Sequence, residues 1–130
     1  MIGILLITHG RLAQEFISAL EHVVGKQTNI MAVAVNADDT LEAKKKEVLS
    51  NLDKVDKGQG IIILTDIFGG TPSNLAIAIM KETNAKVLTG LNLPMLVKIA
   101  SLRATESLSS VAEAGKIAGR KYINIATNLL

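Results

Sequence analysis

The stretch Ile4-Leu5-Leu6-Ile7-Thr8-His9-Gly10 decides the fold that we predict for this chain. Its apolar run has the length of a buried strand, and it ends in a histidine followed by a glycine. Apolar residues on both faces are typical of a parallel strand that helices cover on both sides. We therefore predict a strand over residues 2–7, with His9 where that strand gives way to a turn.

A second stretch, Gly60-Ile61-Ile62-Ile63-Leu64-Thr65-Asp66, has the same form and predicts a strand over residues 61–65. A glycine turn follows it and leads into a helix. Thr71 is a good N-cap for that helix, and Pro72 suits the first helical position, where its missing N–H costs nothing.

Three more strands and four more helices complete the pattern. Further strands are predicted at residues 30–35 and 85–89, with a final short strand at 121–126. Helices are predicted over residues 11–24, 39–55, 71–80, from the turn at 90–94 to 100, and 105–119. The helix from 39 begins with a capping box formed by Asp39 and Glu42. Alternating strands and helices predict a single α/β domain over residues 1–130, with a parallel sheet and right-handed crossovers.

The composition narrows the functional classes. With 48% hydrophobic residues, this chain of 130 residues can bury a sizeable core. Its net charge of +2 argues against a nucleic-acid footprint. There is no cysteine, which excludes a disulfide framework and thiol catalysis and fits a cytoplasmic location. No apolar run is long enough for a membrane span, and we expect neither a signal peptide nor a metal site.

The sheet topology brings the two stretches together. Ligands of open parallel sheets bind beyond the carboxyl ends of the strands, where the strand order reverses. With the common order 2-1-3-4, that crevice lies between the strands that end at His9 and Asp66. Neighbouring strands are about 4.8 Å apart, so the carboxylate can reach the imidazole.

This pair suits nucleophilic chemistry. A hydrogen bond to Asp66 would orient the His9 ring, leave its other nitrogen free and stabilise positive charge that develops during attack. We predict that Gly69, Gly70, Thr71 and Ser73 bind phosphate, since a glycine turn that leads into a helix can cradle an anion on its backbone N–H groups. A nucleophile, an orienting acid and an anion cradle together favour phosphoryl transfer to histidine.

Other polar residues receive weaker interpretations. His22 lies in mid-helix and is expected to be a surface or packing residue. Arg11 either contacts an incoming phosphate or is solvated. The cluster of lysines at 44–46 is interpreted as a solvated helix face.

Three motifs in this order and spacing resemble the IIA domain of the mannose family of the bacterial sugar phosphotransferase system. They are Ile7-Thr8-His9-Gly10, the segment from Thr65 to Asn74, and Gly90-Leu91-Asn92-Leu93-Pro94-Met95-Leu96. The resemblance covers essentially the whole chain. Members of that family often carry an aromatic residue after the first histidine-glycine pair or within the Gly-Gly turn. Here the first position is Arg11 and the turn has Phe68, and we regard both as possible partner contacts.

The resemblance implies a specific role. His9 would be phosphorylated by the phosphocarrier protein HPr and would pass the phosphate to a IIB domain on a separate chain, with Asp66 orienting the ring. It also implies a sheet order of 2-1-3-4 and a homodimer that exchanges an antiparallel C-terminal edge strand. No cofactor is expected, and the membrane would be reached only through IIC and IID components.

Two alternatives remain open at this stage. One is a regulatory or binding module on the same fold, in which the glycine turn holds the phosphate of a ligand. The other is the related phosphocarrier subunit of dihydroxyacetone kinase, although the turn from Gly69 to Pro72 favours the mannose-type domain.

Overall fold

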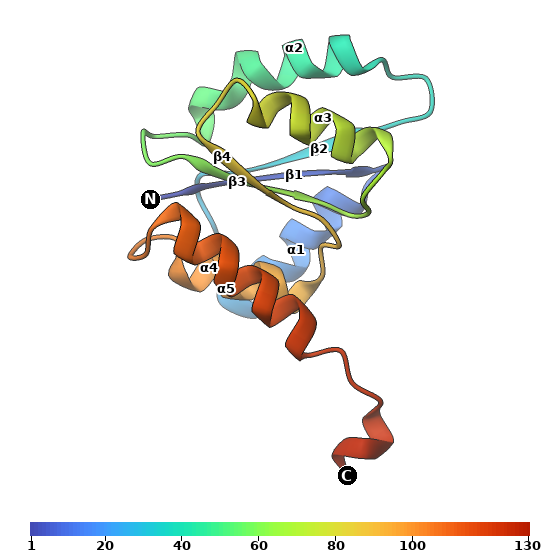
Figure 1. Ribbon diagram of the computed structural model, residues 1–130, viewed down its shortest axis with the longest axis vertical. Coiled ribbons are helices and arrows are strands. Elements are labelled where there is room, and N and C mark those ends of the chain that lie inside the picture. Colours follow the sequence, from blue (N-terminus) through green and yellow to red (C-terminus); the bar gives the residue numbers. More distant parts are fainter.

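The computed structural model describes residues 1–130 and shows a four-stranded sheet between two layers of helices (Figure 1). All three strand pairs are parallel, and the order is β2-β1-β3-β4. The predicted doubly wound α/β fold and its strand order are therefore confirmed. The strands are β1 (Gly3–His9), β2 (Ile30–Val35), β3 (Ile61–Thr65) and β4 (Ala85–Leu88).

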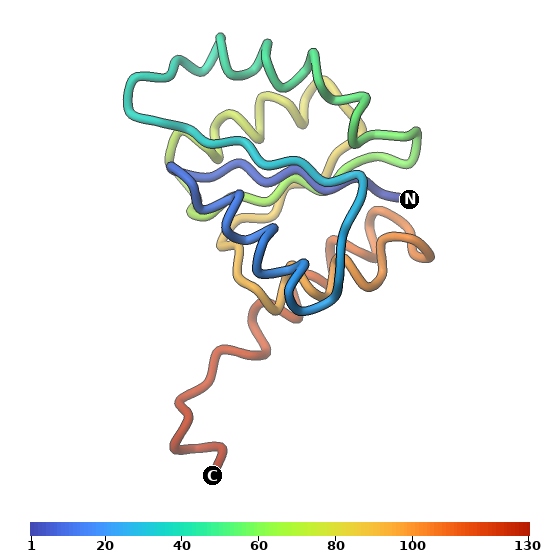
Figure 2. Tube along the Cα trace, turned by 180° about the vertical axis from the view of Figure 1, so that it is seen from behind, coloured from blue at the N-terminus to red at the C-terminus, as the bar shows by residue number.

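Helices cover both faces of the sheet, as Figures 1 and 2 show from opposite sides. One layer holds α1 (Leu12–Val24), α4 (Leu93–Leu102) and α5 (Leu108–Lys121). The other holds α2 (Leu41–Asn51), the short 3-10 helix η1 (Leu52–Lys54) and α3 (Thr71–Met80). None of the helices is long and apolar enough to cross a membrane.

Successive side chains of β1 point into two separate cores. Ile4 and Leu6 pack into the cluster beneath α1, α4 and α5, whereas Leu5 and Ile7 pack into the cluster beneath α2 and α3. All four side chains are fully buried. The unbroken apolar runs in the sequence follow from this burial on both faces, because neither face of the strand meets solvent.

The register brings the ends of the two central strands to one edge. Ile7 of β1 pairs with Thr65 of β3, and His9 pairs with Val35 of β2. Residue 66 therefore emerges beside the last residues of β1. This geometry places a residue that follows β3 next to His9, which lies fifty-seven positions earlier in the chain.

A buried arginine ties the opposite edge of the sheet together. Arg103 is only 2% exposed. Its guanidinium donates to the backbone carbonyls of Ile2, Thr28 and Asn29 and to the side chain of Gln27. Burial lowers the pKa of Arg103. The residue joins the end of α4 to the starts of β1 and β2, far from the carboxyl edge.

Two predicted N-caps are wrong by one residue, and the helix predicted from residue 105 begins at Leu108, after the N-cap Ser107. The N-cap of α2 is Thr40, whose hydroxyl accepts from Ala43 N–H, while Asp39 accepts from the backbone of Asn36 and so shapes the preceding turn. The N-cap of α3 is the extended Gly70 rather than Thr71. Both shifts arise because the cap is set by the backbone angle at which the loop enters the helix, which residue type alone does not specify.

The predicted strand over residues 121–126 does not form within this single chain, and its exchange in a dimer stays a prediction. Lys121 ends α5, and residues Ala126–Leu129 form a 3-10 helix, η2. The segment leaves the body of the molecule, as Figure 2 shows. A strand needs hydrogen-bonding partners on a neighbouring strand, and this segment has none within its own chain.

Candidate functional site

His9 and Asp66 meet at the carboxyl edge of the sheet. The distance between His9 Nδ1 and Asp66 Oδ2 is 2.9 Å, and the backbone N–H of His9 donates to the same oxygen at 2.9 Å. The second carboxylate oxygen accepts from Ile67 N–H at 2.9 Å. Asp66 is thus held by both strand ends, and it in turn fixes the His9 ring.

These contacts define the ionisation state of Asp66. Partial burial raises the pKa of the Asp66 carboxyl, but hydrogen bonds from His9 and Ile67 outweigh it, and the net pKa lies below the usual 3.8. An ionised carboxylate only accepts hydrogen bonds, so the favourable tautomer of His9 carries its proton on Nδ1. The Nε2 lone pair is then free for attack, on a side chain that is 54% exposed.

Gly70 lies against the reactive side of the ring. A Cβ atom placed on Gly70 would be 2.9 Å from His9 Cε1 and 3.2 Å from Nε2, closer than side chains normally approach. Only glycine leaves room here for the imidazole. A group bound to Nε2 would consequently lie beside the backbone of this turn and the N-terminus of α3.

Of the four residues predicted to bind phosphate, two bond to other groups of the turn and two keep free N–H groups. The N–H of Gly69 donates to Ser73 Oγ at 2.8 Å, and the Ser73 hydroxyl donates to Gly70 O at 3.0 Å. Ser73 is fully buried, so in this conformation its hydroxyl shapes the turn from behind. The N–H groups of Gly70 and Thr71 have no acceptor within the chain, and Thr71 is exposed.

The free N–H groups of Gly70 and Thr71 can thus bind an anion at the N-terminus of α3. Free N–H groups and the positive end of the helix dipole both favour negative charge. No group of three or more His, Cys, Asp or Glu side chains is arranged to hold a metal ion. The groups of this site that face a bound anion are the His9 ring and the backbone donors of Gly70 and Thr71.

Thr8 is a residue of the site that the sequence did not reveal. It is fully buried, and its Oγ1 accepts from the N–H of Ala13 at 2.7 Å, which fixes the start of α1 against the end of β1. A threonine immediately before a turn and a helix was the available signal, because such side chains often bond to nearby backbone.

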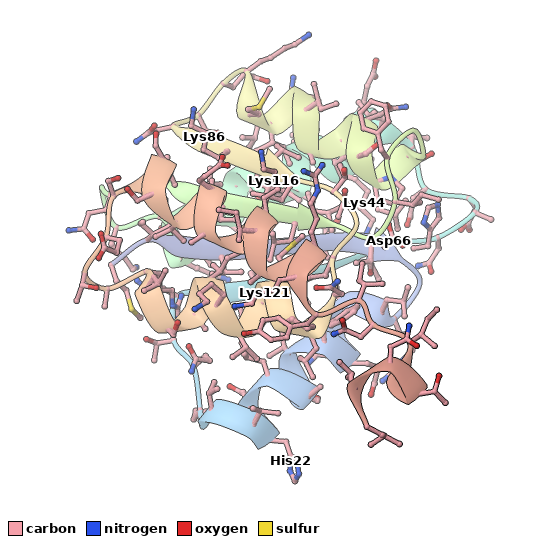
Figure 3. The ribbon with its side chains drawn as sticks, turned by 60° about the horizontal axis from the view of Figure 1, so that its bottom comes forward. His22, Lys44, Asp66, Lys86, Lys116 and Lys121 are labelled. Atoms are coloured by element: carbon pink, nitrogen blue, oxygen red, sulfur yellow. The ribbon has the colours of Figure 1, made fainter.

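Of the remaining predicted residues, Phe68 and Arg11 lie near the site and His22 lies away from it. Phe68 is 71% exposed beside the glycine turn, and Arg11 is exposed at the N-terminus of α1. His22 projects into solvent from the far end of α1, well away from Asp66 in Figure 3, which agrees with its interpretation as a surface residue.

Comparison with known proteins identifies relatives of this chain. The family model EIIA-man, described as "PTS system fructose IIA component", matches residues 3–116. The sorbose-specific EIIA component of Lacticaseibacillus casei is 31% identical over 98 residues, which cover 75% of this chain and 70% of that protein. The mannose-specific EIIAB component of Escherichia coli K12 is 32% identical over 99 residues, and the match covers 75% of this chain but only 30% of that protein.

A solved structure supports the same grouping. The phosphotransferase system component EIIA of Streptococcus agalactiae superposes with a TM-score of 0.86 at 26% identity, covering 98% of this chain and 99% of that one. The likeness therefore extends over the whole fold, including the layers of helices on both faces of the sheet.

Proposed function

Because this chain belongs to the EIIA-man family of the phosphotransferase system, we propose that it relays phosphate through a phosphohistidine at His9. It accepts the phosphoryl group from phospho-HPr and passes it to a IIB domain for sugar uptake. The observation that carries this proposal is the 2.9 Å contact between His9 Nδ1 and Asp66, which leaves Nε2 free beside the start of α3.

The step requires no proton transfer at the reacting nitrogen. The Nε2 lone pair attacks phosphorus, the bond from phosphorus to the donor nitrogen breaks, and the donor keeps that electron pair. The proton on Nδ1 stays in place, and the positive charge that develops on the ring is stabilised by the Asp66 carboxylate. Transfer to the acceptor reverses these events, so one geometry serves both directions.

The backbone donors act on the transferred group. Charge on a phosphoryl group in transfer spreads over its three peripheral oxygens, so catalysis depends on positioning and on electrostatic stabilisation. The free N–H groups of Gly70 and Thr71 can meet those oxygens. Donors preorganised in this way contribute about 3 kcal/mol each to transition-state stabilisation.

The proposal extends to partners and location. We expect HPr and the IIB domain to dock over the exposed Phe68, with Arg11 at the rim, and the membrane to be reached through IIC and IID components. We also expect a homodimer in which residues 121–126 become an antiparallel strand on a sheet edge of the second copy. The absence of cysteine fits a cytoplasmic location.

Phosphoryl transfer from phosphoenolpyruvate, with enzyme I and HPr present, tests the relay. Wild type and His22→Gln should both acquire a phosphate that is labile in acid and stable in base. His9→Gln should acquire none, and Asp66→Asn should keep its fold and react about 10²-fold more slowly. Label that survives His9→Gln would overturn the proposal.

The same assay separates the relay from a binding module. A module that only holds a ligand phosphate on the glycine turn would acquire no covalent label, and His9→Gln would leave its ligand binding unchanged. An unchanged transfer rate in Asp66→Asn would reject the orienting role of the carboxylate.

A further inference from the structure

Arg11 is the only residue with a permanent positive charge in the connections at the carboxyl edge of the sheet. These connections follow the four strands and comprise residues 10–11, 36–40, 66–70 and 89–92. The same connections contain three carboxylates, Asp38, Asp39 and Asp66. Lys44 of α2 lies 3.8 Å from Asp39 and offsets that carboxylate. A phosphoryl group on His9 would add negative charge beside Asp66, so a nearby cation has an electrostatic role there.

Arg11 contributes little to the stability of α1. Arg11 is the N-cap of that helix, and its side chain makes no capping hydrogen bond. Small polar residues are preferred at this position, and a cation at a helix N-terminus opposes the dipole. A residue that disfavours its local structure, with no compensating gain in stability, is often found at a functional site.

The present partner of Arg11 holds it weakly. Its Nη2 lies 3.5 Å from Glu15 Oε1, one helical turn along α1, and the two side chains are 83% and 65% exposed. Exposed pairs of this spacing are weak and are screened by salt. The guanidinium can therefore exchange Glu15 for a stronger anion at little cost.

A phosphoryl group on His9 would be within reach of this side chain. Two consecutive Cα–Cα steps span at most about 7.6 Å, so the long arginine side chain begins close to the imidazole. Gly10 lies between them in a left-handed turn with a φ of 52°. The guanidinium fork matches phosphate geometry and can donate two parallel hydrogen bonds.

We propose that Arg11 is a phosphoryl-binding residue that leaves Glu15 when His9 is phosphorylated and pairs with the phosphoryl oxygens on Nε2. This inference rests on the proposed function. Phosphorylation then breaks one ion pair and forms another, so Glu15 becomes unpaired on the exposed face of α1 only in the phosphorylated state.

Phosphorus NMR of the phosphorylated protein provides the test. A His22→Gln background leaves His9 as the only histidine, and potassium phosphoramidate serves as a donor that needs no protein partner. The measured quantity is the second pKa of the phosphoryl group. A bound guanidinium favours the dianion, so Arg11→Gln should raise this pKa by about half a unit.

The other variants separate binding from general charge effects. Arg11→Lys should give an intermediate value because the cation remains but the fork is lost. Glu15→Gln should lower the pKa, since a competing carboxylate is removed. Lys26→Gln, which removes an exposed positive charge from the loop at the opposite edge, should leave it unchanged.

The outcomes distinguish this inference from the function on which it rests. Equal pKa values for Arg11→Gln and Lys26→Gln, in protein that is phosphorylated on His9, would overturn the role of Arg11 and leave the relay intact. Failure of both phosphoramidate and phospho-HPr to modify His9 would overturn the relay and this inference together.

Discussion

At the scale of single residues, the contact between Gly70 and the His9 ring limits what the site tolerates. The ring is held from one side by Asp66 and lies against the glycine backbone on the other. Both contacts come from the single loop over residues 66–70, which follows β3, whereas His9 itself ends β1. A small change in this loop should alter the chemistry before it alters the fold.

Gly70→Ala tests this constraint. The new Cβ would lie 2.9 Å from His9 Cε1, so the ring must move, and we expect a loss of phosphorylation rate of about 10²-fold. The rate is measured with phospho-HPr under single-turnover conditions, and the fold is checked by circular dichroism.

Gly69→Ala is the matched control for Gly70→Ala. Its Cβ would meet no atom within 4 Å, but its φ of 97° strains any other residue. It should lower the free energy of unfolding by about 1–2 kcal/mol and affect the rate less. A larger rate loss in Gly69→Ala than in Gly70→Ala would contradict the steric argument.

The depressed pKa of Asp66 predicts a pH dependence of stability. A folded pKa below the unfolded value means that the unfolded chain binds more protons between the two, so the free energy of unfolding rises with pH there. This contribution is present above the unfolded pKa and is lost as pH falls through the folded one. Asp66→Asn lacks it.

Urea denaturation of wild type and Asp66→Asn at several pH values measures this effect. We expect the stability difference between them to shrink as pH falls from about 5 to about 2. A difference that stays constant over this range would show that Asp66 titrates alike in the folded and unfolded chains.

At the scale of elements, Asn92 joins two helices on one side of the sheet. Its Oδ1 accepts from Met95 N–H at 3.1 Å and caps α4, while its Nδ2 donates to Gly119 O at 2.9 Å near the end of α5. One amide thus satisfies a helix start and a carbonyl of another helix, a role that suits both ends of the asparagine side chain.

Replacement of Asn92 should separate these two contributions. Asn92→Ala removes both bonds and should lower the free energy of unfolding by about 2 kcal/mol. Asn92→Ser keeps a capping oxygen but cannot donate to Gly119, so it should lose about half as much. Equal losses in chemical denaturation would show that the cap contributes nothing.

At the scale of the whole molecule, the C-terminal segment is the part that one chain leaves unpacked. Ile123, Ile125 and Leu129 are 74%, 69% and 67% exposed, although each is apolar. Figure 1 shows the segment directed away from the sheet and both helix layers. Exposed apolar residues clustered in one segment are typical of an interaction site, and a second copy can supply the missing contacts.

Removal of residues 123–130 should convert a dimer into a monomer. We expect sedimentation of the full chain to give twice the monomer mass at micromolar concentration, and the truncated chain to give the monomer mass with its helical signal retained. Val23→Ser, which removes a similarly exposed apolar side chain from α1, should leave the dimer intact. A full chain that sediments as a monomer would contradict the exchange.

The sequence determined the four strands of the sheet and, with the order 2-1-3-4 that is common for this architecture and implied by the family resemblance, the meeting of His9 with Asp66. Strand periodicity and burial are encoded locally, and a parallel sheet with right-handed crossovers leaves few ways to arrange four such strands. Once the order is known, the ends of β1 and β3 must be neighbours. The family resemblance was carried by the same short motifs.

Only the tertiary structure decided which atoms of the site are free. Three features of the site depend on how a loop packs against side chains that are distant in sequence. They are the burial of Ser73, the approach of Gly70 to His9 Nε2 and the capping of α3 at Gly70. Residues 121–126 form no strand within the single chain for a related reason. Their alternating apolar residues favour a strand, but a strand forms only where a neighbouring backbone offers hydrogen bonds. A single chain provides no such neighbour for this segment.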